Sequence, residues 1–137
     1  MSGAVTLSLT AIRVSDLARS VEFYTKGCGF EMEREFTTPS FTAAIVRAGS
    51  AGLELILPTD GTASEPAEHG DMLCKLVLNT DDPEAVMGRA CGLGGSVVTS
   101  PQEYPEYGMT IGVIADPDGY ELEFVGRPAE PSGDRDH

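Results

Sequence analysis

The sequence predicts an α+β fold of two βαβββ modules, which form a curved eight-stranded mixed sheet with outer helices and an inner cleft. Two observations support this prediction. The pattern of the chain repeats, so that residues 12–16 correspond to residues 78–82. Each half also contains one helix-period segment followed by three strand-like runs. A single βαβββ module cannot cover both faces of its sheet, whereas two modules side by side can.

The two helices are expected at 16–28 and 83–93, each with apolar residues along one face. Asp16 and Asp81 or Asp82 are candidate N-caps, because a carboxylate there accepts a hydrogen bond from a free backbone N–H. Pro83 suits the first helical turn, where its missing N–H is not needed. The apolar faces consist of Leu17, Val21, Tyr24 and Cys28 in the first helix, and Val86, Met87, Ala90 and Leu93 in the second.

The strand-like runs cover 30–36, 41–47 and 53–57 in the first half, and 97–103, 109–115 and 121–125 in the second. Side chains two residues apart in a strand point to the same face. This alternation places Leu122 and Phe124 in the core and turns Glu121 and Glu123 toward the cleft. By the same rule Glu54 faces the cleft from the first half.

Turn-forming and acidic residues divide the chain. The expected parts are a first module at 1–60, a connector at 61–72, a second module at 73–126 and a disordered tail at 127–137. The connector and the tail are rich in Pro, Gly and charged residues, a composition that does not build a core.

Charge and cysteine content limit the function classes. The 137 residues carry a formal net charge of −13, which argues against binding to nucleic acid. No apolar run approaches the length of a membrane span, and without a basic-then-apolar start we expect no secretion signal. Cys28, Cys74 and Cys91 lack ligand-like spacing, so we interpret them as reduced, buried thiols of a cytoplasmic protein.

Three stretches of the chain resemble the vicinal-oxygen-chelate superfamily, which includes glyoxalase I, bleomycin-resistance proteins and extradiol dioxygenases. They are "IRVSDLARSVEFYTKGCGF" at 12–30, "GLELILP" at 52–58 and "DPDGYELEFV" at 116–125. Their order, together with the internal repeat, indicates the fold of this superfamily. Because the fold serves many functions, the function has to be argued from the site.

The resemblance also implies where a metal ion would bind. In metal-dependent members, four cleft-facing positions on the first and fourth strands of each module supply the ligands, commonly two histidines and two acids. The matching positions hold Leu9, Glu54, Lys75 and Glu123. An ammonium group does not coordinate a metal, and transition metals favour imidazole or thiolate ligands. We therefore expect no metal and no other cofactor; Mg²⁺ held by two acids and water stays open as an alternative.

The expected cleft combines a charged cluster with apolar walls. Lys75 is expected to neutralise both Glu54 and Glu123, so that its replacement by Met would lower stability near neutral pH. His69 and His137 lie in the connector and the tail, where we expect exposure. Aromatic residues near the cleft mouth either stack on a ligand or pack on a neighbouring strand. The predicted ligand-binding residues are Leu7, Leu9, Ala11, Phe41, Ile56, Val77, Tyr104, Tyr107 and Glu121.

Three function classes agree with these features. The first is a metal-independent homodimer that sequesters an apolar, aromatic or cationic small molecule in a dimer cleft, as drug-binding members of the superfamily do. The second is a cofactor-free lyase or isomerase, with Glu54 or Glu123 as general base and Lys75 as charge partner. The third is a metal-dependent glyoxalase-like enzyme or dioxygenase, which the missing histidines disfavour. The expected partners are a small-molecule ligand and a second copy of the chain, without nucleic acid or membrane.

Overall fold

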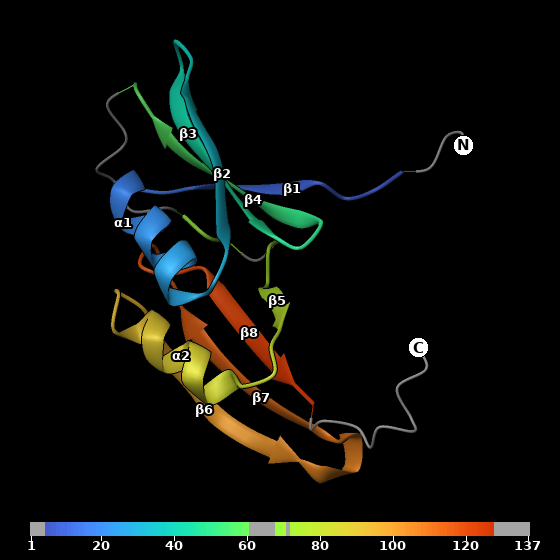
Figure 1. Ribbon diagram of the computed structural model, residues 1–137. Coiled ribbons are helices and arrows are strands. Elements are labelled where there is room, and N and C mark those ends of the chain that lie inside the picture. Colours follow the sequence, from blue (N-terminus) through green and yellow to red (C-terminus); the bar gives the residue numbers. More distant parts are fainter. Residues whose placement is uncertain (1–4, 61–67, 71, 128–137) are drawn as a thin grey trace.

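The computed structural model describes residues 5–60, 68–70 and 72–127. It contains two βαβββ modules, one above the other in Figure 1, which confirms the predicted fold class. Most of the expected connector and all but Arg127 of the expected tail lie outside the described residues.

The first module contains β1 (Leu9–Arg13), α1 (Leu17–Glu22), η1 (Phe23–Gly27), β2 (Glu31–Thr37), β3 (Phe41–Ala48) and β4 (Ala51–Pro58). Its strands are ordered β1-β4-β3-β2, with β1 parallel to β4 and the other neighbours antiparallel. The helix expected at 16–28 is an α-helix only as far as Glu22, and η1 continues it as a turn of π-helix.

The second module contains β5 (Leu76–Asn79), α2 (Pro83–Cys91), β6 (Ser96–Tyr104), η2 (Pro105–Tyr107), β7 (Met109–Ala115) and β8 (Glu121–Gly126). Its strand order, β5-β8-β7-β6, repeats that of the first module. The register repeats too, because Ala11 of β1 pairs with Glu54 as Val77 of β5 pairs with Glu123. The repeat of 66 residues seen in the sequence, in which residue 77 corresponds to residue 11, is therefore also present in the structure.

The expected continuous eight-stranded sheet is not formed within one chain. Among the described residues the strands make two separate four-stranded sheets. The modules contact each other through their helices instead, since α2 packs on η1 as well as on β6, β7 and β8. Gly27 permits this approach, because a Cβ atom there would lie 3.0 Å from the Cα of Ala90. The edge strands β1 and β5 consequently stay unpaired with each other.

Both α-helices begin at the predicted caps. The Asp16 carboxylate accepts a hydrogen bond from the backbone N–H of Arg19 at 3.0 Å. The Asp82 carboxylate accepts a hydrogen bond from the backbone N–H of Ala85 at 3.1 Å, so Asp82 rather than Asp81 is the N-cap of α2. Pro83 lies in the first turn, as predicted.

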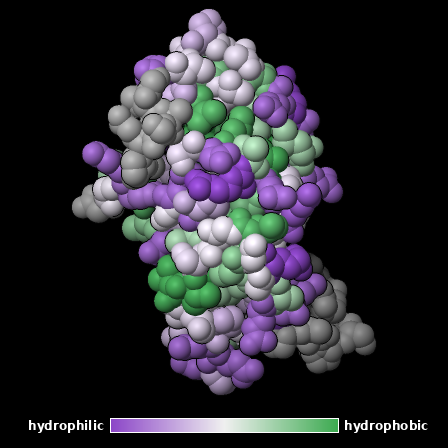
Figure 2. All heavy atoms as spheres, turned by 90° about the vertical axis from the view of Figure 1, so that its left-hand side faces the viewer, coloured by the Kyte–Doolittle hydropathy of each residue, from purple (hydrophilic) through white to green (hydrophobic). Residues whose placement is uncertain are grey.

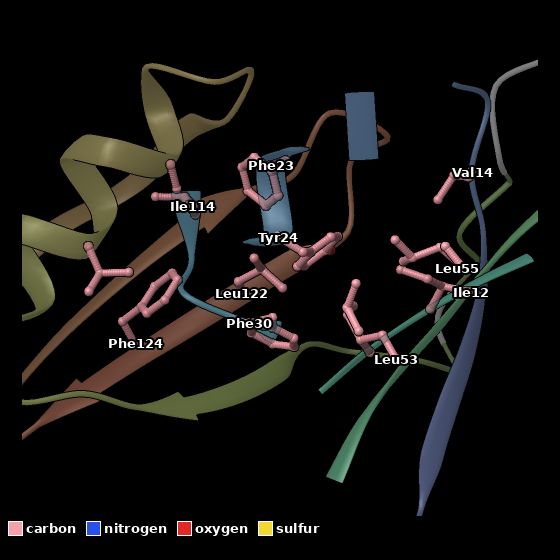
Figure 3. Close-up of a cluster of buried hydrophobic side chains, with 14 of the residues drawn as sticks. Ile12, Val14, Phe23, Tyr24, Phe30, Leu53, Leu55, Ile114, Leu122 and Phe124 are labelled. Carbon is pink, nitrogen blue, oxygen red and sulfur yellow. The ribbon is translucent and has the colours of Figure 1, made fainter. Parts of the chain in front are cut away.

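One hydrophobic core serves both modules. Leu122 and Phe124 are fully buried, as the alternation predicts, and so are Leu53 and Leu55 on β4. The rings of Phe23, Tyr24 and Phe30 lie between the residues of the two sheets in Figure 3. Burial of this shared apolar surface is the main force that joins the modules.

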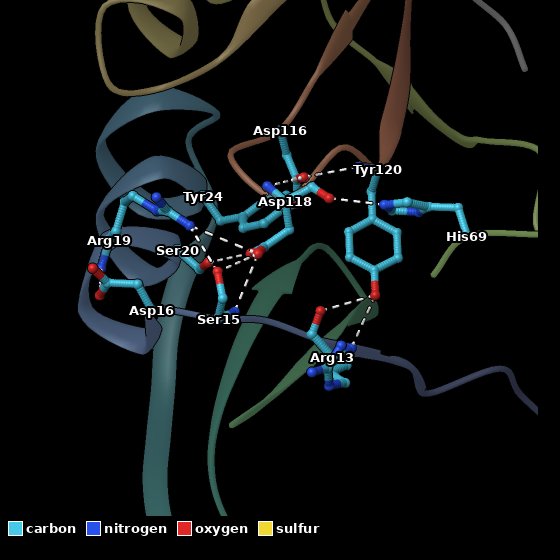
Figure 4. Close-up of polar contacts among 10 residues, drawn as sticks. All are labelled: Arg13, Ser15, Asp16, Arg19, Ser20, Tyr24, His69, Asp116, Asp118 and Tyr120. Atoms are coloured by element: carbon cyan, nitrogen blue, oxygen red, sulfur yellow. Dashed lines mark hydrogen bonds and ion pairs between the residues drawn. The ribbon is translucent and has the colours of Figure 1, made fainter. Parts of the chain in front are cut away.

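A polar latch reinforces this junction. It is formed by the turn Asp116–Tyr120 of the second module against the start of α1 (Figure 4). The buried Tyr24 hydroxyl donates to Asp116 Oδ2 at 2.6 Å. Asp116 Oδ1 accepts the backbone N–H groups of Asp118 and Tyr120 at 2.8 and 2.9 Å. Every oxygen of this buried carboxylate therefore has a partner, as burial of a charge requires.

The rest of the turn binds the strand-to-helix junction of the first module. Asp118 Oδ1 accepts from the hydroxyl of Ser15 at 2.6 Å and from its backbone N–H at 3.1 Å. The Tyr120 hydroxyl donates to the carbonyl oxygen of Arg13 at 2.8 Å. His69 Nε2 lies 2.8 Å from the carbonyl oxygen of Asp118, and its ring contacts Tyr120. His69 is thus exposed, as expected, but held by the turn.

Burial changes the proton affinities in the latch. It raises the pKa of Asp116 above its ordinary value, although the hydrogen bonds from Tyr24 and from the backbone act in the opposite direction. Burial, followed by the nearby Asp116 carboxylate, also holds the pKa of Tyr24 well above its usual range. Tyr24 is therefore a neutral hydrogen-bond donor at physiological pH.

The surface that carries the helices is mainly hydrophilic, with smaller hydrophobic patches between the polar groups (Figure 2). The expectation of three buried thiols is wrong for Cys74, which is exposed, whereas Cys28 and Cys91 are half-buried. All three cysteines are free. No helix among the described residues is long and apolar enough to cross a membrane.

Candidate ligand-binding site

The predicted pair of Lys75 and Glu123 is present in the structure. Lys75 Nζ lies 3.1 Å from Glu123 Oε2. Glu123 projects from β8, between Val77 of β5 and Val113 of β7. Lys75 itself lies one residue before β5 rather than inside the strand. The side chains are 43% and 18% exposed, so water screens the attraction between them.

Glu54 does not join this pair. It lies on β4 of the other sheet, between Ala11 of β1 and Ile45 of β3. Its side chain is half-buried and forms no hydrogen bond or ion pair with the described residues. The expected three-membered cluster is therefore not assembled within one chain, because the two acids belong to sheets that do not form a continuous surface.

The four positions to which the family resemblance assigns metal ligands do not fit a transition metal here. Leu9 offers no donor atom, and Lys75 places an ammonium group against the carboxylate of Glu123. The described residues contain no group of three or more His, Cys, Asp or Glu side chains that could hold a metal ion. Two separated carboxylates do not provide the imidazole or thiolate set that zinc and similar metals favour.

Aromatic residues lie on the same sheet as Glu54. Phe41 begins β3, and its ring meets that of Phe36 edge-on with a centroid distance of 6.2 Å. The Arg34 guanidinium lies 5.0 Å from the centre of the Phe36 ring. Phe36 was not among the predicted ligand-binding residues. It lies two residues after Arg34 on β2, and this spacing, which puts both side chains on the same face of the strand, could have indicated it. Ile56 pairs with Arg13 and Ala43 on the same sheet.

The other predicted residues are dispersed. Tyr104 ends β6 and is half-buried, whereas Tyr107 in η2 is exposed. Glu121 begins β8 and lines a small pocket of about 150 Å³ together with Lys75 and His69. Leu7 precedes β1, and both Leu7 and Val77 lie at a larger pocket between the modules.

This larger pocket has a volume of about 630 Å³ and was not predicted from the sequence. Leu53 of β4 and Leu122 and Phe124 of β8 are among its buried lining residues. None of its lining residues is charged at neutral pH, since burial raises the pKa of the Cys28 thiol to about 12. It is thus an uncharged space with both apolar and polar lining residues, and neither Glu54 nor the Lys75–Glu123 pair lines it.

Two βαβββ modules of the same strand order, each with an acid on its fourth strand, define a class of two-module proteins. The chain belongs to the Glyoxalase/Bleomycin resistance protein/Dioxygenase superfamily, whose family model matches residues 6–124. The expected family is thereby confirmed.

Relatives agree with this assignment. The chain is 27% identical over 128 residues to a protein of Haemophilus influenzae named lactoylglutathione lyase, covering 90% of this chain and 94% of the relative. It is 29% identical over 119 residues to a probable lactoylglutathione lyase of Synechocystis sp., covering 85% and 91%. A mutant of glyoxalase I from Zea mays has a similar fold, with a TM-score of 0.78 and 23% identity. That match covers 91% of this chain and 46% of the maize chain.

Proposed function

We propose that this protein binds a small apolar or aromatic molecule, neutral or cationic, without a metal ion. The observation that carries the proposal is the ion pair of Lys75 with Glu123, 3.1 Å apart, at two of the positions where metal-dependent relatives place ligands. The half-buried carboxylate of Glu54 and the nearby apolar and aromatic side chains provide a surface that suits such a ligand.

We propose that the protein is a homodimer. Within one chain, Glu54 and the Lys75–Glu123 pair lie on different sheets, and the edge strands β1 and β5 have one strand neighbour each among the described residues. A second copy would cover these edges and bring the open face of one sheet against that of another. Such a cleft would be shared between subunits.

The binding experiment is a thermal-shift screen of neutral, cationic and anionic aromatic compounds with EDTA present throughout. We expect stabilisation by at least one neutral or cationic compound, and a smaller shift by cationic compounds after Glu54→Gln. Glu31→Gln, an exposed acid on β2, is the matched control. Stabilisation by anionic compounds alone would contradict the proposed ligand class, and no stabilisation by any compound would contradict binding.

Metal content tests the proposal independently. Protein purified without chelator is expected to carry less than about a tenth of an equivalent of transition metal. The double variant Leu9→His with Lys75→His puts one imidazole on the sheet of Glu54 and one next to Glu123, and in the proposed homodimer it is expected to bind Zn²⁺ in elemental analysis. Near-stoichiometric metal in the unchanged protein, removed by EDTA, would refute metal independence.

A cofactor-free lyase or isomerase is the second candidate. Glu54 favours it, because a half-buried carboxylate without an ion-pair partner among the described residues is available as a general base. The names of the two relatives suggest the substrate to test, the adduct of methylglyoxal with glutathione. Formation of lactoylglutathione in EDTA, abolished by Glu54→Gln but not by Glu31→Gln, would favour this candidate over simple binding.

A further inference from the structure

We infer that the open face of the first sheet, which is the face that carries Glu54, binds an aromatic zwitterion. The ammonium group of this ligand meets Glu54 of β4, and its carboxylate group meets Arg34 of β2. The inference rests on the proposed binding function and names the charge pattern of the ligand. It also adds Arg34 to the residues that bind the ligand.

Strand pairing places Arg34 and Glu54 on the same face of the sheet. Ile45 of β3 pairs with Glu54 on one side and with Arg34 on the other. Paired residues of neighbouring strands point to the same side of a sheet. Leu53 and Leu55, the neighbours of Glu54, are buried on the opposite side, where α1 packs on β3 and β4. Arg34 and Glu54 therefore project from the open face, two strand spacings or about 10 Å apart along the sheet.

Both of these charged groups lack an opposite charge. Neither the Arg34 guanidinium nor the Glu54 carboxylate forms an ion pair or a side-chain hydrogen bond with the described residues. Arg47, two residues after Ile45, differs from Arg34, because it pairs with Glu33 at 2.6 Å. Two unpaired opposite charges on one face favour a ligand that carries both charges itself, since each of its ends then makes a charged hydrogen bond.

The surface between and beside the two charges is apolar and aromatic. Ile45, which is buried, lies between them. The Arg34 guanidinium lies 5.0 Å from the centre of the Phe36 ring, and this contact holds its long side chain in place. The Phe36 ring in turn meets the ring of Phe41 edge-on. An aromatic body would bury apolar surface here while its two ends reach the charged groups.

The net charge of the chain favours a zwitterion over an anion. At a net charge of −13, the electrostatic field of the protein repels anions. A net-neutral ligand avoids this repulsion, and its carboxylate group still reaches Arg34. A plain cation, in contrast, leaves Arg34 without a partner. We therefore expect a zwitterion to bind more tightly than a cation or an anion with the same ring.

The test compares three compounds that share one ring: the zwitterion para-(aminomethyl)benzoate, the cation benzylamine and the anion benzoate. NMR titration with EDTA present measures their dissociation constants for the unchanged protein and for Glu54→Gln, Arg34→Gln and Arg89→Gln. Arg89 is the matched control, because it is exposed on α2 and forms no ion pair with the described residues. We expect the zwitterion to bind the unchanged protein at least about tenfold more tightly than either singly charged compound.

The two site variants should divide this effect by charge. Glu54→Gln is expected to weaken the zwitterion and benzylamine about tenfold and not to weaken benzoate. Arg34→Gln is expected to weaken the zwitterion and benzoate by a similar factor and not to weaken benzylamine. Arg89→Gln should leave all three dissociation constants unchanged. A variant that had lost its fold would weaken all three compounds alike, and circular dichroism detects that case.

Three outcomes would overturn the inference: a zwitterion that binds no more tightly than benzylamine, an affinity for the zwitterion that Arg34→Gln leaves unchanged, or an equal loss in Arg89→Gln. Benzylamine binding that depends on Glu54 would in each of these cases leave the proposed binding function standing. Failure of all three compounds to bind also overturns the inference. The binding function itself is refuted only if, in addition, no compound of the wider thermal-shift screen stabilises the protein.

Discussion

The segment "DPDGYELEF" contains two pairs of acids with opposite environments. Asp116 is buried and has a hydrogen-bond partner for each oxygen, and Asp118 binds the start of α1. Five residues further on, Glu121 is exposed and Glu123 meets an ammonium group in contact with water. The first pair joins the two modules, and the second pair belongs to the open surface where a ligand is proposed. Closely spaced carboxylates in one motif therefore have different roles, and the burial of each side chain determines its role.

Replacing Asp116 tests the structural half of this comparison and has the largest expected effect. Asp116→Ala leaves the Tyr24 hydroxyl and two backbone N–H groups without their acceptor. Each buried group left unsatisfied costs about 1–3 kcal/mol, so the free energy of unfolding should fall by about 3 kcal/mol or more. Urea denaturation measures this loss. Glu121→Ala is the control, with an expected change within about 0.5 kcal/mol. A loss below about 1 kcal/mol for Asp116→Ala would show that the latch does not hold the modules.

Removing the Tyr24 hydroxyl has a smaller and pH-dependent effect. Tyr24→Phe deletes one buried hydrogen bond and should lower stability by about 1–3 kcal/mol near neutral pH. The pKa of Asp116 is raised in the folded protein, so its folded form binds a proton more tightly than its unfolded form. The stabilisation that Asp116 contributes is therefore fully present below the pKa that it has in the unfolded chain. It is lost as the pH rises through the pKa that Asp116 has in the folded protein.

The variant should extend this loss to higher pH. The Tyr24 hydrogen bond lowers the pKa of Asp116, so its removal raises that pKa further. Urea denaturation from about pH 4 to 8 should show the stability of Tyr24→Phe falling over a wider range than that of the unchanged protein. Tyr107→Phe, at an exposed ring, should leave the profile unchanged. Identical profiles for Tyr24→Phe and the unchanged protein would mean that Asp116 does not titrate in this range.

The sequence predicted the features that depend on residues close together along the chain, and it missed those that depend on contacts between distant residues. Alternation places Leu122 and Phe124 correctly, because successive side chains of a strand must point to opposite faces. The partner of Asp116 was missed because Tyr24 lies 92 residues away and only the contact between modules brings them together. The family resemblance, carried over to the second half by the internal repeat, placed Lys75 near Glu123, but no periodicity states how two sheets are oriented. The position of Glu54 relative to that pair was consequently predicted incorrectly for a single chain.

The Lys75–Glu123 pair tests the functional half of the comparison and has the smallest expected effect on stability. The sequence suggested a buried cluster and a substantial loss for Lys75→Met, but the Lys75 side chain is 43% exposed. An exposed ion pair contributes about 0.2–1 kcal/mol and is weakened by salt. A double-mutant cycle of Lys75→Met and Glu123→Gln should therefore give a coupling energy below about 1 kcal/mol that shrinks at about 1 M salt.

The same cycle distinguishes a single chain from an assembly. A coupling energy above about 2 kcal/mol would contradict an exposed pair and require that something excludes water from it. Repeating the cycle over a range of protein concentrations identifies the cause. If the coupling falls as the protein is diluted, a second copy covers the pair; if it persists, the cover comes from the chain itself. Because Lys75 and Glu123 contact no other described residue through an ion pair, a small coupling at every concentration means that their charges remain available to a ligand.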